Sequence, residues 1–265
     1  MFYYPEFDKD GQKILTEIDG INSNMLMDIS VFKMKEGDVR EFVYPDKEVA
    51  VLLTEGKIKI TAEGVNYTAD RKSVFDDLPT VIHCPKGKKT VIEAFAESEI
   101  IRLAALNDKD FPVKLYEKSD IICTTSSEGI WENVAVRDVN TVFDYDNAPY
   151  SKLVVGEVIA RQGRWWSYVP HGHPQPEVYY YKYGRPEGFG ACFIDDKAYT
   201  VKDGSYGCFA DGASHVQVTA PCFPEYCCWM IRHLDGNPWR KTRTVNPAYK
   251  WIEDDLNKIN YRQFK

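Results

Sequence analysis

Residues 165–184 read WWSYVPHGHPQPEVYYYKYG, and residues 204–215 read GSYGCFADGASH. In an extended strand, side chains two residues apart point to the same face, so His171 and His173 are expected to project together. Glu177 follows a Pro-Gln-Pro bend and is expected to begin the next strand on that face. His215 ends the second stretch. Three imidazoles and a carboxylate predict a site for one divalent transition metal, either Zn, Mn, Fe, Co or Ni.

The rest of the chain favours an all-β fold with a short C-terminal helix. Aromatic residues make up 14% of the 265 residues, and short apolar runs recur between Gly, Asp, Asn and Pro residues. A helix is expected only near the end, around Pro247 to Asn257. The expected strands are Met25 to Met34, Val49 to Leu53, Lys57 to Thr61, Thr90 to Phe95, Ile100 to Leu106, Leu153 to Ala160, Val178 to Tyr183, Gly190 to Ile194, His215 to Thr219 and Tyr226 to Ile231.

The two halves of the chain repeat one order of strands and turns, which predicts a duplicated β-barrel. The spacings His171-x-His173-x3-Glu177 and Gly212-x2-His215 resemble the two cupin motifs, so we expect two tandem cupin barrels. The predicted domains are residues 1–118, an N-terminal cupin without metal ligands, and residues 119–265, a C-terminal metal-binding cupin. Thr90 stands where the second half has His215.

Composition excludes several classes of protein. The chain carries 33 basic and 40 acidic residues, a formal charge of −7, which disfavours nucleic-acid binding. No apolar run approaches the roughly 20 residues that a membrane-spanning helix needs. The seven cysteines form no C-x-x-C motif, and the N-terminus shows no targeting pattern, so we expect reduced thiols and a cytoplasmic protein.

The segments around the expected metal ligands resemble those of the 5-deoxy-glucuronate isomerase family of myo-inositol catabolism, which is related to 5-keto-4-deoxyuronate isomerase. The resemblance covers nearly the whole chain. It rests on residues 165–173 and 177–181, on Pro186-x-Gly188-Phe189-Gly190, on Asn133-x3-Arg137-x-Val139 and on Asn246-Pro247-Ala248-x-Lys250-Trp251-Ile252.

This resemblance implies an intramolecular oxidoreductase that converts 5-deoxy-glucuronate to 2-deoxy-5-keto-gluconate through an enediolate. A base must move the proton between adjacent carbons, and Glu177, a metal-bound hydroxide or a neighbouring tyrosine could serve. Tyr179 and Tyr181 share the parity of Glu177 and should face the cavity, whereas Tyr180 and Lys182 should face away. Simple filling of the barrel interior is an equally good reading of the two inward tyrosines.

The family usually carries an arginine near Cys192, which this chain lacks. We therefore hypothesise that Arg161 or Arg232 binds the substrate carboxylate, with a surface salt bridge as the plainer alternative. The basic cluster Trp239 to Arg243 is interpreted as a solvated turn. His83 is expected to be structural.

Two other functions stay open at this point. A cupin dioxygenase is one, because three histidines and a carboxylate also hold ferrous iron. A sugar-binding cupin without activity is the other. In each case the expected partner is a small sugar acid, and the spare surface of the N-terminal barrel favours a homo-oligomer.

Overall fold

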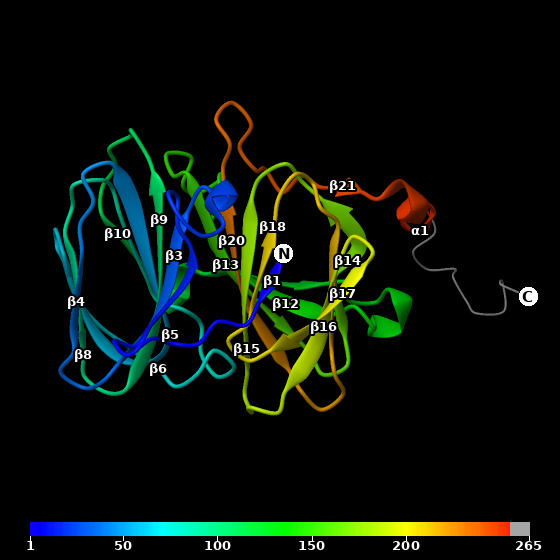
Figure 1. Ribbon diagram of the computed structural model, residues 1–265, viewed down its shortest axis with the longest axis horizontal. Coiled ribbons are helices and arrows are strands. Elements are labelled where there is room, and N and C mark those ends of the chain that lie inside the picture. Colours follow the sequence, from blue (N-terminus) through cyan, green and yellow to red (C-terminus); the bar gives the residue numbers. More distant parts are fainter. Residues whose placement is uncertain (255–265) are drawn as a thin grey trace, which may run out of the picture.

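The computed structural model describes residues 1–254, which consist almost entirely of β-strands. Figure 1 shows two barrels side by side, the N-terminal half in blue to cyan and the C-terminal half in green to orange. The all-β prediction with a short terminal helix is confirmed. The domain limits at residues 118 and 119 stay a prediction.

The N-terminal barrel is built around one long bent strand, β5, which pairs with four other strands. The sequence predicts two strands separated by a turn at Gly56, but the structure has a single strand with an irregularity between Leu53 and Glu55. Gly56 has a φ of +101°, and a Cβ there would collide with Ser98, so glycine is required at this bend. The strands are β2 (Gln12–Thr16), β3 (Asp28–Met34), β4 (Val39–Phe42), β5 (Lys47–Ala62), β6 (Val65–Arg71), β7 (Val81–Cys84), β8 (Thr90–Ala94), β9 (Ser98–Leu106) and β10 (Lys114–Tyr116).

The C-terminal barrel consists of a seven-stranded and a five-stranded sheet. The first has the order β1-β18-β15-β20-β13-β12-β11, so the N-terminal strand β1 lies at the edge of the second barrel (Figure 1). Its strands are β1 (Phe2–Tyr3), β11 (Ile122–Ser126), β12 (Arg137–Phe143), β13 (Leu153–Ala160), β15 (Glu177–Tyr183), β18 (Tyr206–Phe209) and β20 (Glu225–Arg232). The second has the order β17-β16-β19-β14-β21, with β14 (Trp165–Gly172), β16 (Phe189–Ile194), β17 (Lys197–Lys202), β19 (His215–Thr219) and β21 (Thr244–Val245).

Helical segments are few and short. The helix predicted at Pro247 to Asn257 begins as η4 (Pro247–Tyr249) and continues as α1 (Lys250–Asp254), and its last three predicted residues lie outside the described part. Three further 3-10 turns are η1 (Ser23–Met25), η2 (Lys118–Asp120) and η3 (Trp131–Asn133). Among residues 1–254, no helix has the length and hydropathy needed to cross a membrane.

Three apolar cores organise the molecule. One fills the N-terminal barrel and one fills the C-terminal barrel. The third lies between the barrels, where the outer faces of β3, β5 and β9 pack against those of β13, β15 and β20. Strand β15 takes part in two of these cores, because its alternate side chains point to opposite faces. Tyr179 and Tyr181 belong to the interior and Tyr180 to the interface between barrels, which confirms the predicted parity.

Candidate metal centre

Four histidine and glutamate side chains meet at one end of the C-terminal barrel because three strands end or begin there. His171 stands at the end of β14, Glu177 begins β15, and His215 begins β19. Strands β14 and β19 pair with His171 opposite His215. Gly172 allows this close approach, since a Cβ there would collide with the carbonyl oxygen of Gly212.

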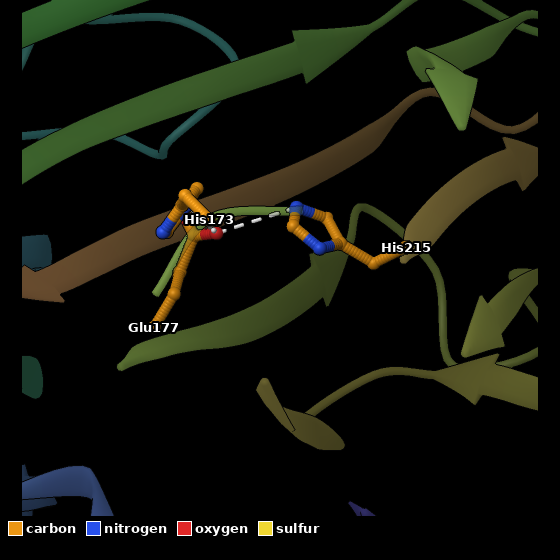
Figure 2. A group of neighbouring side chains, drawn as sticks. All are labelled: His173, Glu177 and His215. Atoms are coloured by element: carbon orange, nitrogen blue, oxygen red, sulfur yellow. Dashed lines mark hydrogen bonds and ion pairs between the residues drawn. The ribbon is translucent and has the colours of Figure 1, made fainter. Parts of the chain in front are cut away.

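His173, Glu177 and His215 form a buried group whose candidate ligand atoms all lie within 4.8 Å of one another. The Oε2 atom of Glu177 is 3.1 Å from Nε2 of His173 and 3.3 Å from Nε2 of His215. Figure 2 shows the three side chains pointing toward one another. The structure therefore brings three of the four predicted ligands together.

His171 lies beside this group, with its ring centroid 5.1 Å from that of His215. Nδ1 of His171 is 2.6 Å from the carbonyl oxygen of Val169, and Nδ1 of His215 is 3.1 Å from that of Ala213. A carbonyl oxygen only accepts hydrogen bonds, so Nδ1 carries the proton in both rings and Nε2 keeps its lone pair. Nε2 of His215 is buried without a hydrogen-bond partner among the described residues. This donor set fits a divalent transition metal.

Burial and neighbouring charges shift the pKa values of these four side chains in different directions. Burial lowers the pKa of His171 to about 3, helped by the charges of His215 and Arg243. Burial also lowers the pKa of His215. Burial alone would raise the pKa of Glu177, but the hydrogen bond and charge of His173, with the other imidazoles, lower it overall. Burial alone would lower the pKa of His173, but its hydrogen bond to Glu177 and the charge of that carboxylate raise it overall. A bound cation would take the place of this proton, because a coordinating imidazole must be neutral.

A cavity of about 200 Å³ opens onto these four side chains. Drug-sized ligands occupy about 300–1,000 Å³, so this cavity suits a small metabolite. Its walls include the aromatic side chains Trp166, Tyr179, Trp229 and Trp239.

Of the two predicted catalytic tyrosines, Tyr179 lies on the cavity wall and Tyr181 lies farther inside the barrel. Tyr179 lines the cavity, with its ring centroid 5.5 Å from that of His215. Tyr181 lies deeper in the barrel, where its hydroxyl donates to Oε1 of Gln217 at 3.1 Å. Burial raises the pKa of both phenols well above the usual value of 10. Tyr181 therefore fills the interior, the plainer of its two predicted roles.

The structure does not bring the two predicted carboxylate-binding arginines to the cavity. Arg161 pairs with Asp138 at 2.9 Å on the surface, where their side chains are 49% and 37% exposed. Arg232 follows Ile231, the residue paired with Glu177, so its side chain points to the opposite face of the sheet. There it donates to the carbonyl oxygens of His233 and, at 3.4 Å, Leu106. Neither arginine lines the cavity that the four candidate metal ligands share.

The segment Trp239 to Arg243 is exposed at residues 240–243, as the sequence suggested. It also lines the cavity, with Trp239, Lys241 and Arg243. Strand β21 follows this segment and pairs with β14, placing Val245 opposite His171. His233 accepts a hydrogen bond at Nδ1 from the backbone N–H of Trp239 at 3.0 Å. The clustering of basic residues was visible in the sequence, but these long-range anchors were not.

Arg137 is the third cation on the cavity wall, and it was also missed. It begins β12, and Val139 on the same face of that strand lines the cavity too. The only sequence signal was its place in the motif Asn133-x3-Arg137-x-Val139, which carried no role.

Comparison with known proteins places this centre in context. The profile of the KduI/IolB family matches residues 2–252. The chain is 24% identical over 261 residues to the 5-deoxy-glucuronate isomerase of Bacillus subtilis (strain 168), covering 92% of this chain and 94% of that protein. It is 25% identical over 241 residues to the enzyme of the same name from Geobacillus kaustophilus (strain HTA426), covering 84% of each.

Solved structures share the fold. An IolB-like protein from Salmonella typhimurium LT2 superposes with a TM-score of 0.80 at 17% identity, over 95% of this chain and 98% of that one. Oxalate decarboxylase of Lactobacillus farciminis gives a TM-score of 0.66 at 12% identity, over 95% and 88% of the two chains. The prediction of two tandem cupin barrels is confirmed.

Proposed function

The chain belongs to the KduI/IolB family, and from this premise we propose that it is a metal-dependent aldose-ketose isomerase acting on a sugar acid, most specifically 5-deoxy-glucuronate. The observation that carries the proposal is the buried convergence of His173, Glu177 and His215 on a small cavity that His171 also lines. The expected product is 2-deoxy-5-keto-gluconate.

His171, His173, Glu177 and His215 would hold the metal, His171 through Nε2, the ring nitrogen that does not face the carbonyl oxygen of Val169. A bound divalent metal supplies a Lewis acid that polarises the carbonyl and stabilises negative charge developing on the sugar oxygens. Such charge stabilisation beside the buried side chains of His173, Glu177 and His215 is worth more than in water, because the surrounding dielectric is lower.

The isomerisation moves two protons, one between carbons and one between oxygens. Transfer of the carbonyl from C1 to C2 removes a proton from C2 and delivers one to C1, while a proton also passes from O2 to O1. Glu177 and Tyr179 line the cavity and are assigned to this transfer, Glu177 as the acceptor at its carboxylate and Tyr179 as a hydrogen-bond donor to a sugar oxygen.

A proton NMR time course in deuterated water tests the proposal. Protein stripped with a chelator is reloaded separately with Zn, Mn, Fe, Co or Ni and mixed with 5-deoxy-glucuronate. We expect conversion to the 2-keto sugar only after reloading, with deuterium entering next to the carbonyl. A His171→Ala variant tests the fourth ligand and should lose metal affinity. Folded, fully metallated protein that leaves the sugar acid unchanged would contradict the isomerase assignment.

The setting of the enzyme is also proposed. All seven cysteines are free thiols, which supports a reducing compartment such as the cytoplasm. A homo-oligomer stays a prediction.

A further inference from the structure

Arg137 presents a guanidinium to the cavity with most of its donors unused. Its Nη1 donates two long hydrogen bonds, to Oγ of Ser127 at 3.3 Å and to the carbonyl oxygen of Ala135 at 3.4 Å. A guanidinium has five N–H donors, so those on Nε and Nη2 have no partner among residues 1–253. Both atoms belong to a side chain that lines the cavity.

The arginines of the chain fall into two groups, those paired with a carboxylate and those, such as Arg102, Arg232 and Arg137, that contact only neutral acceptors among the described residues; of this second group only Arg137 lines the cavity of the candidate metal centre. Arg71 makes a two-pronged contact with Glu157, with distances of 2.8 and 2.9 Å. Arg161 makes a similar pair with Asp138. For Arg137, the described residues provide no carboxylate within ion-pair distance. A partly buried cation without an anion is costly, and a carboxylate entering the cavity would supply the missing charge.

The charged side chains around Arg137 also favour an anionic ligand in the cavity. Arg243 lines the same cavity and adds a second positive charge, although its Nη2 also contacts Glu253 at 3.1 Å. Burial and the charge of Arg243 both lower the pKa of Arg137. A chain with a net charge of −7 thus gathers cations beside its candidate metal centre. An incoming anion would relieve their mutual repulsion.

We infer that Arg137 is the carboxylate-binding residue of the site, receiving the acid group of the substrate in a two-pronged contact while the His/Glu group takes the carbonyl end. This inference rests on the proposed function and extends it, because it fixes the direction of the sugar in the cavity. Arg243 supports the contact through its charge. A planar guanidinium matches the two carboxylate oxygens, whereas lysine offers a single point of charge.

The test compares an acid with its neutral counterpart. One ligand is 5-deoxy-glucuronate reduced at C1, which cannot isomerise, and the other has a hydroxymethyl group in place of the carboxylate. Calorimetry with zinc-loaded protein measures both affinities. We expect Arg137→Gln to weaken binding of the acid by about 10- to 150-fold, the loss of hydrogen bonds to a charged group. Binding of the neutral sugar should change less than about twofold, and zinc content should stay the same.

Two further variants control the result. Arg137→Lys keeps the charge and should fall between the wild type and Arg137→Gln in its affinity for the acid. Arg161→Gln removes an exposed cation outside the cavity and should bind both ligands like the wild type. Circular dichroism checks that each variant is folded.

Several outcomes would overturn the inference. These are an equal loss of affinity for both ligands, an unchanged affinity for the acid, and wild-type protein that binds no acid. The result also separates the two proposals. Acid binding that depends on Arg137 without any turnover would retain the carboxylate site and remove the isomerase, whereas turnover that is indifferent to Arg137 would do the reverse.

Discussion

The two barrels share a strand plan but differ in what their central strands carry inside. Strand β5 directs Val49, Val51 and Leu53 into a closed apolar core. Its counterpart β15 directs Glu177 and Tyr179 into the other barrel. The same strand plan therefore accommodates an apolar interior and one with polar side chains. A few polar residues at one end of the second barrel are enough to form a candidate metal centre there.

The outer faces of the same strands explain what the apolar barrel contributes. Lys182, on the outer face of β15, reaches Glu99 of the N-terminal barrel at 2.7 Å. Arg71 of β6 pairs with Glu157 of β13, and both side chains are buried. Together with the apolar core between the barrels, these contacts pack the N-terminal barrel directly against the strand that begins with Glu177.

Replacing a predicted metal ligand of the second barrel with the residue found at the corresponding position of the first barrel should have the largest effect. His215→Thr introduces the residue that the first barrel has at the corresponding position, Thr90. We expect bound metal to fall below about one tenth and isomerase activity to fall about 1,000-fold, since metal charge stabilisation is worth several kcal/mol. Mass spectrometry of bound metal and the NMR assay measure both. Thr90→Val is the matched control, and retention of stoichiometric metal by His215→Thr would contradict the ligand assignment.

Removing a buried charge between the barrels should have the next largest effect. Arg71→Met leaves Glu157 buried with hydroxyl donation from Tyr226 at 2.7 Å but without a cation. We expect the free energy of unfolding to fall by about 3–5 kcal/mol, as for other broken buried pairs. Urea unfolding followed by tryptophan fluorescence measures it. The neighbouring Lys72, paired with Asp76 on the surface, provides the control Lys72→Met, which should leave the midpoint unchanged.

The polar interior of the second barrel should also give stability a distinctive pH dependence. Glu225 is fully buried, and its carboxyl group accepts hydrogen bonds from Trp166 at 2.9 Å and from Tyr183. Burial raises its pKa from 4.5 to about 8. A carboxyl group that is neutral in the folded state stabilises it fully below pH 4.5. That contribution is lost as the pH rises from 4.5 through about 8, because only the unfolded chain ionises freely.

Glu225→Gln should remove this dependence. Between pH 5 and pH 8 we expect the wild type to lose stability relative to the variant by about 1.4 kcal/mol per pH unit. Urea unfolding across this range provides the measurement. Glu97→Gln changes an exposed residue of the other barrel and serves as the control. Its free energy of unfolding should depend on pH in the same way as that of the wild type. Parallel curves for Glu225→Gln as well would show that Glu225 is ionised in the folded protein.

Much of the fold followed from local patterns in the sequence. Alternating side chains and turn residues located the strands, and the parity of β15 correctly separated Tyr179 from Tyr180. The bend at Gly56 was misread as a turn, because a glycine with positive φ serves either purpose and only the pairing partners decide.

The sequence by itself determined that His173, Glu177 and His215 could converge. Strand parity aligned His171, His173 and Glu177, and the spacing Gly212-x2-His215, which resembles a cupin motif, supplied His215. Only the tertiary structure decided which cations reach the cavity. Arg232 directly follows Ile231, which pairs with Glu177. Its side chain therefore points to the face of the sheet opposite the cavity. Arg137 and Arg243, more than 100 residues apart, are brought to the same wall by pairing of β12 with β13 and of β21 with β14. Such contacts depend on sheet register and closure, which short-range patterns do not encode.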